Sequence, residues 1–296
     1  MSYGGNRRDG FPAGKVGGAG IVVAIPVYRA ELSENEAFSF RRNTAVLGGK
    51  YPIVLFAPEG MDLAVYRGIF PEFEVESFPA RFFRSIGDYS RLLLSEEFYE
   101  RFSRFEWLLI CQLDALALSD ELEVWCSTPY DFIGAPIPAR WEFYMDGSAS
   151  DTVCNGGFSL RRISAFQKVL RAGDAPMYTR DSLKYFFRRH CRRGNFLRAL
   201  IPLARLIGIA NRRGSCLERL RRDGIFEDMV FRALSQPGLE PRLAVPPLNE
   251  AARFALDGGF LWKYHELSGR TTPVAVHAWH QPEGMEFLRS IRRLES

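Results

Sequence analysis

The chain has 296 residues, of which 47% are hydrophobic and 25% charged, with a formal net charge of +4. These proportions are ordinary for a soluble globular protein, and the length suits one large domain or two small ones. No stretch reaches the roughly 18 apolar residues of a membrane-spanning helix, so that class of protein is not expected.

The first twenty residues are rich in glycine and carry Arg7, Arg8 and Lys15 without an apolar core segment. A secretory signal needs such a segment, so residues 1–20 are predicted to be a disordered leader before one domain over 21–296. The five cysteines form no Cys-x-x-Cys pair and are odd in number, which favours a reducing, cytoplasmic setting over zinc binding or a disulfide framework. They are Cys111, Cys126, Cys154, Cys191 and Cys216.

The first half of the domain alternates between predicted strands and helices. Strands are expected at 21–28, 52–57, 74–78 and from Trp107, and helices at 33–47, 64–70 and 88–105. The helix at 33–47 has Ser33 as its N-cap and Glu36 at the capping-box position, and Gly48-Gly49 ends it. This alternation predicts an α/β fold with a mixed, mainly parallel sheet flanked by helices.

The second half is less regular. Short strands are expected at 130–136 and 155–161 and near the C-terminus, and helices at 162–172 and 227–234. Between Arg180 and Arg222, 13 Lys and Arg residues face two acids, a charge of +11 that leaves −7 for the remainder. This basic segment interleaves bulky apolar and cationic residues, so it has three interpretations: a helical insertion packed on the body, a surface for anionic membranes, or a nucleic-acid surface.

Asp114 is the most informative single residue. It follows the apolar run Trp107–Cys111, which is typical of a buried strand, and its neighbours are almost wholly apolar. A charge there is costly unless it meets a cation or several donors, and open α/β sheets bind ligands outside the carboxyl ends of their strands. Asp114 is therefore predicted to bind a metal ion or a polar ligand, with a strand-end cap for backbone N–H groups as the alternative.

Five short motifs occur in an order that resembles a known family. They are Tyr89–Leu94, Leu113–Asp120, Asn155–Phe158, Glu227-Asp228 and His277. Together they resemble the GT-A fold nucleotide-sugar glycosyltransferases. The chain is most similar to the branch around glycogenin and galactinol synthase and to an uncharacterised microbial branch of sugar transferases. The resemblance covers residues 22–280, with the helical insertion at about 174–225.

The resemblance implies a metal site with one departure from the family pattern. In this fold a DxD motif holds Mn²⁺ or Mg²⁺ against the donor diphosphate, and Asp114 falls on its first Asp. The second Asp falls on Leu116, which cannot ligate. His277 matches a late histidine that supplies a further ligand, so metal bound through Asp114 and His277 and a metal-free site both stay open. For His277, a buried, hydrogen-bonded histidine is the other interpretation.

The resemblance also implies a donor site. Tyr28 would stack on the base, Arg29 would reach a phosphate, and Arg91 would clamp one bidentately. Asn155 would bond sugar hydroxyls, while two glycines would let the backbone approach the ligand closely. The alternatives are loop residues, a surface arginine and an ordinary turn. The implied donor-binding residues are Pro26, Tyr28, Arg29, Arg91, Gln112, Asp114, Asn155, Gly156 and Gly157.

Glu227 and Asp228 carry the implied chemistry. In inverting members of the fold a carboxylate here takes the proton from the acceptor hydroxyl; Asp228 is the first choice and Glu227 the second. The alternative is that both acids only stabilise the start of a helix. A retaining reaction also stays open.

The expected function is transfer of a sugar from a nucleotide-sugar donor, with UDP favoured, to a glycan or lipid-linked glycan acceptor. The expected location is cytoplasmic, with residues 180–222 on the inner face of the membrane. A non-catalytic glycan- or membrane-binding module on a degenerate transferase fold is the main alternative, and a nucleic-acid-binding protein is the third.

Overall fold

A computed structural model describes residues 20–138, 152–153, 155–172, 226–235 and 237–294. The predicted leader up to residue 19, almost all of the predicted helical insertion and three of the five cysteines lie outside these residues. Within the described part of the chain, no helix combines the length and the apolar character needed to cross a bilayer.

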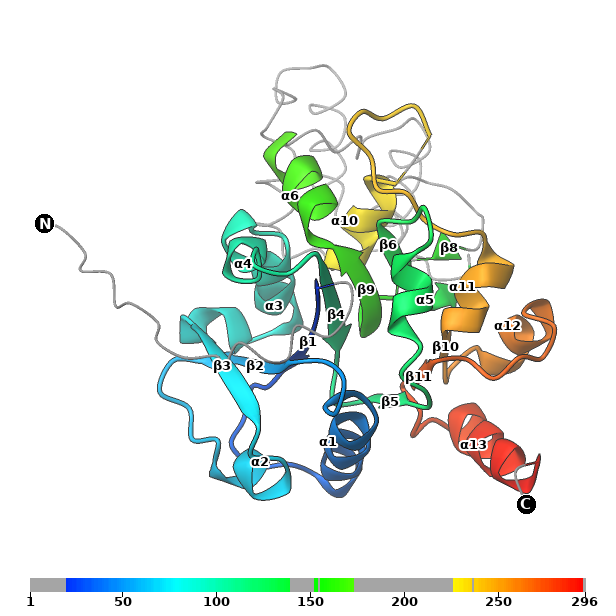
Figure 1. The fold of residues 1–296 in the computed structure, drawn as a ribbon, viewed down its shortest axis with the longest axis horizontal. Helices are drawn as coiled ribbons and strands as arrows, with labels where there is room; N and C mark the ends of the chain where they lie inside the picture. The colour runs from blue at the N-terminus through cyan, green and yellow to red at the C-terminus, as the bar shows by residue number, and fades with distance from the viewer. Residues whose placement is uncertain (1–19, 139–151, 154, 173–225, 236, 295–296) are drawn as a thin grey trace, which may run out of the picture.

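The elements follow one another as Figure 1 labels them. The strands are β1 (Ile21–Pro26), β2 (Ile53–Pro58), β3 (Phe73–Phe78), β4 (Trp107–Cys111), β5 (Ala115–Ala117), β6 (Phe132–Gly134), β7 (Pro136–Ile137), β8 (Thr152–Val153), β9 (Phe158–Arg162), β10 (Ala255–Asp257) and β11 (Ala275–His277). The helices are α1 (Glu34–Leu47), α2 (Ala64–Ile69), η2 (Ala80–Phe83, a 3₁₀ helix), α3 (Ile86–Leu93), α4 (Glu96–Arg101), α5 (Leu122–Cys126), α6 (Ile163–Ala172), α10 (Glu227–Ala233), α11 (Leu248–Phe254), α12 (Leu261–Leu267) and α13 (Pro282–Leu294).

The central sheet has six strands in the order β3-β2-β1-β4-β9-β6. Neighbours from β3 to β4 pair in parallel, whereas β9 is antiparallel to both β4 and β6. Only β9 therefore runs against the rest, which confirms the expected α/β class with a mainly parallel sheet flanked by helices. The chain passes from β1 to β2 on one side and later places β4 on the other side of β1. This reversal opens a crevice beyond the carboxyl ends of β1 and β4.

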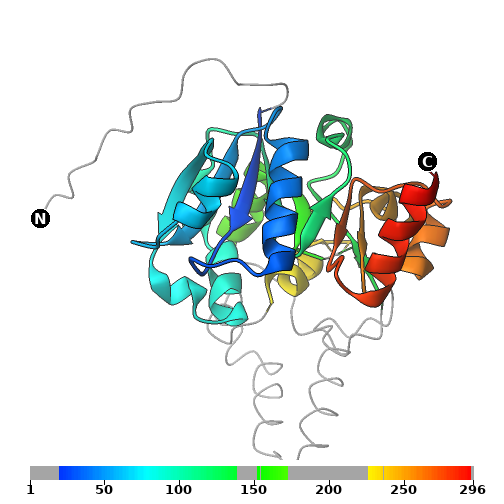
Figure 2. The same ribbon diagram turned by 90° about the horizontal axis from the view of Figure 1, so that it is seen from below.

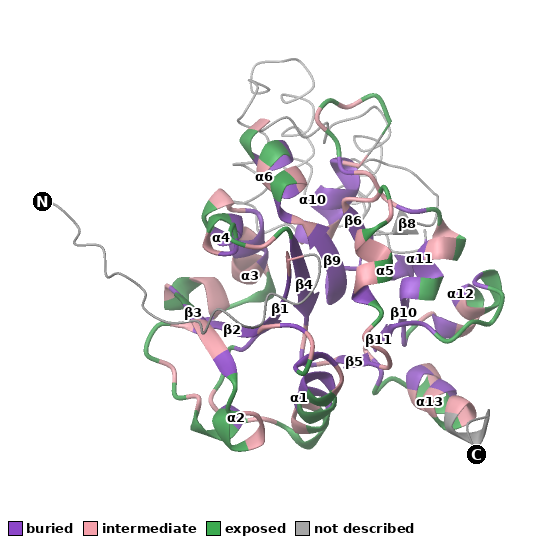
Figure 3. Ribbon diagram, in the orientation of Figure 1, coloured by how far each residue is buried: buried purple, intermediate pink, exposed green. Residues whose placement is uncertain are grey.

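The strands β1, β2, β4, β6 and β9 of the central sheet are almost wholly buried, whereas the edge strand β3 is partly exposed, as Figure 3 shows. Alternate residues of β1, β2 and β4 point to opposite sides, since side chains alternate along a strand. One face packs against residues of α3, α4, α6 and α10, and the other against residues of α1, α2 and α5. Burial on both faces explains the nearly continuous apolar sequences of these strands.

A second sheet of three strands, ordered β10-β11-β5, stands beside the first. Figures 1 and 2 place it and the C-terminal helices at the opposite end of the molecule from β3. Leu116, Leu256 and Val276 from its three strands form a third apolar core with residues of α11, α12 and α13. The sequence analysis expected short strands here but not these three helices.

Local signals in the first half are largely confirmed. The helix predicted over 33–47 begins at Glu34 behind a complete capping box between Ser33 and Glu36, and Gly48 is its C-cap. The single helix predicted over 88–105 is wrong. The chain forms α3 and α4 instead, because the side chain of Ser95 accepts from the backbone N–H of Phe98 and caps a new helix.

One buried asparagine fixes the strand that follows Asp114. Asn43 of α1 donates from Nδ2 to the carbonyl of Ala115 (2.9 Å) and accepts at Oδ1 from the N–H of Ala117 (2.8 Å). The other edge of β5 pairs with β11. Asn43 thus takes the place of a neighbouring strand, and β5 is held on both edges.

Replacing Asn43 by Ala should therefore destabilise the fold by about 2–4 kcal/mol, because two buried backbone groups of β5 lose their partners. Urea unfolding at neutral pH measures the change. Asn35→Ala, on the exposed start of the same helix, is the control and should stay within about 0.5 kcal/mol of the unchanged protein. A similarly small effect of Asn43→Ala would contradict this role.

Candidate functional site

Two polar side chains lie at the carboxyl end of β4. Gln112 and Asp114 are separated by Leu113, which is buried in the core. The backbone N–H of Gln112 donates to the carbonyl of Gly157 (2.8 Å), which ties this end of β4 to the glycine turn before β9. Gln112 and Asp114 border a cavity of about 500 Å³.

The cavity lies at the crevice between β1 and β4. It is lined by Pro26, Tyr28, Glu36, Phe83, Arg84, Ser85, Ile86, Tyr89, Gln112, Leu113 and Asp114. Four residues of the predicted donor site therefore border it, and they are Pro26, Tyr28, Gln112 and Asp114. The ring of Tyr28 is half-exposed, so one face is open to a ligand.

Two arginines of the predicted donor site make ion pairs, Arg29 with Glu36 of the cavity lining and Arg91 with Asp88. The Nη2 of Arg29 lies 2.6 Å from Oε2 of Glu36, and Nη1 of Arg91 lies 2.8 Å from Oδ1 of Asp88. Neither arginine is among the residues that line the cavity. Their predicted part in donor binding stays a prediction.

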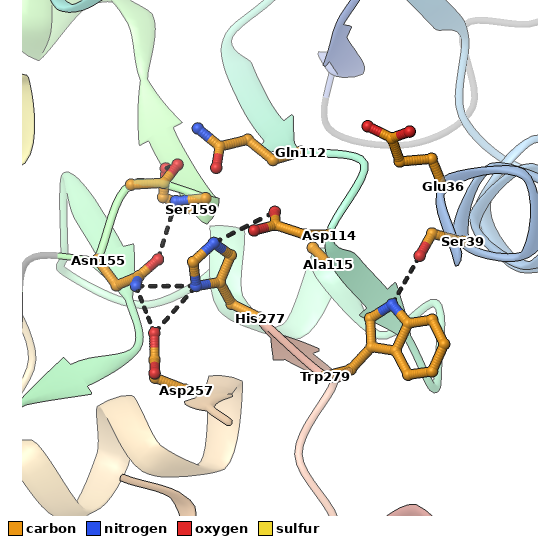
Figure 4. A network of polar contacts seen from close by, with 12 residues as sticks. Glu36, Ser39, Gln112, Asp114, Ala115, Asn155, Ser159, Asp257, His277 and Trp279 are labelled. Atoms are coloured by element: carbon orange, nitrogen blue, oxygen red, sulfur yellow. Dashed lines mark hydrogen bonds and ion pairs between the residues drawn. The ribbon is translucent and has the colours of Figure 1, made fainter. Parts of the chain in front are cut away.

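Asp114 meets His277 across the two sheets, and Figure 4 shows the contact. His277 Nε2 lies 3.3 Å from Oδ1 of Asp114. The register explains this proximity, because His277 of β11 pairs with Ala115 of β5, the residue after Asp114. The predicted pair is thus brought together by the tertiary structure.

A second carboxylate holds the other side of the imidazole. His277 Nδ1 lies 2.9 Å from Oδ2 of Asp257, and Nδ2 of Asn155 donates to the same oxygen at 2.8 Å. Asn155 Oδ1 accepts from the N–H of Gly157 (2.9 Å), which fixes the orientation of the amide. An ionised carboxylate can only accept, so the contact with Asp257 assigns a proton to Nδ1 of His277.

The charges around His277 shift two pKa values. Burial by itself lowers the pKa of His277, but hydrogen bonds and attraction to Asp114 and Asp257 outweigh it and raise that pKa to about 10. Burial likewise raises the pKa of Asp114, but the hydrogen bond and charge of His277 outweigh it and lower that pKa below its usual range. Asp114 and an imidazolium therefore form an ion pair at neutral pH.

Asp257 was missed by the sequence analysis. It pairs with His277 in the register of β10 and β11, so the two side chains are direct neighbours. A signal was available, because Asp257-Gly258-Gly259 repeats the pattern of Asn155-Gly156-Gly157, a polar residue followed by two glycines at a strand end.

The side chain of Leu116 does not point into the site. It pairs with Val276 and packs in the third core, with 4% of its surface exposed. Leu116 therefore belongs to the third apolar core, and its correspondence to the second position of a DxD motif stays a prediction. The polar pair that the structure presents is Gln112 and Asp114.

The residues at this site provide some of the ligands that a divalent cation needs. His277 Nε2 is buried and directed at Oδ1 of Asp114, 3.3 Å away. A carboxylate behind the other ring nitrogen is the usual support of a metal-binding histidine. Among the described residues, no group of three or more His, Cys, Asp and Glu is arranged to hold a metal. Asp114 and His277 would hold one only with ligands from a bound diphosphate or from the Gln112 amide oxygen.

An acidic pair lies on the other side of the glycine turn, with Glu227 buried and Asp228 partly exposed. Glu227 and Asp228 begin α10, and Glu227 Oε2 accepts from Ser90 Oγ at 2.5 Å. A Cβ on Gly156 would lie 3.0 Å from Oε1 of Glu227 and 3.7 Å from Cβ of Asp228. Burial, and then the charge of Glu227, raise the pKa of Asp228 to about 7. Helix stabilisation alone, the alternative for both acids, does not explain the bond from Glu227 to α3.

The comparisons with known proteins place the chain in a family. It belongs to the family described as "Protein of unknown function (DUF5672)", whose model matches residues 72–277, well over half of the chain. No curated protein sequence matches the chain.

Three solved structures illustrate its structural relatives. The Mn/GDP form of core-mannan synthase A from Aspergillus fumigatus is 9% identical, with a TM-score of 0.40, over 71% of this chain and 70% of that chain. Mouse xyloside xylosyltransferase 1 is 10% identical, with a TM-score of 0.46, over 86% and 96%. Galactosyltransferase LgtC, in complex with donor and acceptor sugar analogues, is 14% identical, with a TM-score of 0.45, over 86% of each chain.

Adding a methyl group at Gly157 should disturb the site. A Cβ there would lie 2.2 Å from both Cδ2 and Nε2 of His277, so Gly157→Ala should displace the imidazole and cost about 1–3 kcal/mol. The ¹⁵N imidazole resonances of His277 and urea unfolding measure the two effects. Gly49→Ala is the control, because no atom lies within 4 Å of its Cβ position. Unchanged His277 resonances in Gly157→Ala would contradict the packing described.

Proposed function

We propose that the protein is a GT-A glycosyltransferase that moves a sugar from a nucleotide-sugar donor, UDP-linked by preference, to a glycan or lipid-linked acceptor. One observation carries the proposal. Asp114 and His277 meet at the edge of a cavity beyond the carboxyl ends of β1 and β4, and the Glu227–Asp228 carboxylate pair lies just across Gly156. Open α/β sheets bind their ligands at this place.

The cavity suits a nucleotide. Its volume of about 500 Å³ lies within the usual range for ligand pockets, and its lining includes the rings of Tyr28, Phe83 and Tyr89. Tyr28 would stack on the base, because half of its surface is exposed at the cavity. The diphosphate would then lie near Asp114 and Gln112. Asn155 would bond the sugar only if its side chain released its present hydrogen bonds to Asp257 and Gly157.

A divalent cation, when bound by Asp114 and His277 with the diphosphate, would neutralise part of the charge that develops on the leaving group. His277 itself carries positive charge at neutral pH when no metal is bound, and it is held rigidly by Asp257. The proposed site can therefore offset the charge of the diphosphate in either case, which keeps both the metal-dependent and the metal-free possibility open.

Asp228 is the proposed base. The acceptor hydroxyl oxygen forms a bond to the anomeric carbon while the bond from that carbon to the diphosphate oxygen breaks and its electron pair leaves with the diphosphate. The hydroxyl proton passes to the carboxylate of Asp228. A pKa near 7 suits this task, because the carboxylate is then both basic and largely ionised at physiological pH. Glu227 is the second candidate, although its Oε2 is already bonded to Ser90.

The alternative, a non-catalytic glycan- or membrane-binding module, rested on Leu116 as a lost ligand. Leu116 supplies no ligand from its place in the apolar core, so this alternative stays open beside the proposed enzyme. Attachment to the inner face of an anionic membrane through residues 180–222 stays part of the proposal, and this segment lies outside the described residues.

Donor binding is tested by calorimetric titration with UDP and GDP, each with and without Mn²⁺. One nucleoside diphosphate should bind, and Asp114→Ala should weaken that binding at least tenfold, because the diphosphate loses its partner at the end of β4. Asp120→Ala, six residues later and paired loosely with Lys50, is the control and should bind like the unchanged protein. The proposal is wrong if neither nucleotide binds under any metal condition.

Turnover should depend on Asp228. Asp228→Asn should lower kcat by about 10²–10⁴-fold with donor affinity retained, since only the proton acceptor is removed. In the unchanged protein, kcat/KM should rise with pH through about 7 and then level off, because the base acts in its ionised form. Rate measurements from pH 5 to 9 check both. If Glu227→Gln abolishes turnover while Asp228→Asn does not, Glu227 is the base instead.

A further inference from the structure

Arg161 is an arginine with no exposed surface in the middle of the central sheet. It lies on β9, between Leu108 of β4 and Phe132 of β6. A buried charge without compensation is strongly unfavourable, so its surroundings should provide a negative partner or a polar shell.

The hydrogen bonds of Arg161 all go to neutral acceptors. Nε donates to Ser159 Oγ (3.0 Å), Nη1 to the hydroxyl of Tyr99 (3.1 Å) and Nη2 to the carbonyl of Gly156 (3.4 Å). The rings of three further residues surround the guanidinium, with centroids at 5.2–5.8 Å. They belong to Phe132, Phe166 and Phe231. This cage orients the group but supplies no full negative charge.

The negative charge comes from the acidic pair. The space beside Gly156, where a Cβ would stand, is 3.3 Å from Nη2 of Arg161 and 3.0 Å from Oε1 of Glu227, with Asp228 next to it. The guanidinium and the carboxylates thus border the same small space, and glycine leaves it open. Opposite charges that border one buried space influence each other's ionisation without direct contact.

We propose that Arg161 is a positioning residue for the Glu227–Asp228 pair: its guanidinium is the fixed positive charge beside the two carboxylates, and through the carbonyl of Gly156 it holds the glycine turn against them. The inference rests on the proposed function only in taking Asp228 to be the base. The interaction of the Arg161 charge with the two carboxylates is present in the protein without any ligand.

The groups facing Asp228 set the direction of the effect. Glu227 on the same helix opposes ionisation of Asp228, whereas Arg161 on β9 and His277 on β11 favour it, as does the N–H of Met229. Burial raises the pKa of Tyr99 to about 12 and raises that of Tyr89 further, so both phenols are neutral beside the pair. Ser90 donates to Glu227. Loss of the Arg161 charge should therefore make Asp228 harder to ionise.

The neighbouring arginine is a matched control. Arg162 follows Arg161 in β9, so its side chain takes the opposite face of the sheet, where it lies over the ring of Trp107 (4.5 Å) and 3.4 Å from Oδ1 of Asp131. Removing its charge perturbs the same strand without touching the acidic pair.

The experiment follows the carboxyl carbon of Asp228 by NMR in ¹³C-aspartate-labelled, ligand-free protein from pH 4 to 9, with the resonance assigned through Asp228→Asn. Arg161→Met should raise the titration midpoint of Asp228 by about one pH unit, and Arg161→Lys should restore most of that shift. Arg162→Met should leave the midpoint where it is. An unchanged midpoint in folded Arg161→Met would overturn the inference.

The stability of Arg161→Met does not test the inference, because replacing a buried ion by an apolar group can be neutral or stabilising. If Arg161→Met does not fold, Arg161→Gln, which also removes the charge but keeps a polar group beside Ser159 and Tyr99, takes its place. It should raise the midpoint by about one pH unit as well, and no change there overturns the inference. This experiment uses no ligand, so its result is independent of donor binding. If the midpoint of Asp228 shifts in the Arg161 variants but the protein binds no nucleoside diphosphate, the inference is supported and the proposed function is wrong.

Discussion

The site depends on the pairing of β11 with β5. This short antiparallel contact sets His277 against Ala115 and so brings the imidazole to Asp114 at the end of β4. A shift of one residue would turn His277 toward the third core and bring Val276 to the carboxylate, because side chains alternate along a strand. Asn43 on the other edge of β5 holds the same strand in place.

The strand register brings His277 close to Asp114, and a second set of contacts fixes the orientation of its imidazole. Asp257 accepts the Nδ1 proton, Asn155 bonds the same carboxylate, and Gly157 lets the ring pack directly against the backbone. Asp257 comes from β10 and the other two residues from the turn before β9, and together they leave one ring nitrogen, Nε2, directed toward Asp114. The free-energy cost of burying the imidazolium is offset because it lies between the carboxylates of Asp114 and Asp257.

The glycine turn 156–157 separates two electrostatic environments. On one side lie Asp114 and His277, which suit a bound anion or a cation with its phosphate. On the other side lie Glu227, Asp228 and the buried Arg161. Side chains at either glycine would fill the space in which these groups meet. Gly156 and Gly157 therefore leave room for the side chains on both sides of the turn. Glycine is required here because a Cβ would collide with those side chains, and not because of a positive φ.

The sequence by itself determined the local features. The apolar strands, the capping box of α1 and the exceptional position of Asp114 could be identified from it, because each depends on near neighbours in the chain. The choice of Asn155, Asp228 and His277 came from the order of short motifs and stays a prediction. It could not determine that Leu116 turns away from the site, that Asp257 supports His277, or that Arg161 lies beside the acidic pair. Those facts depend on strand register and on contacts between residues 20 to more than 150 positions apart, which only the tertiary structure decides.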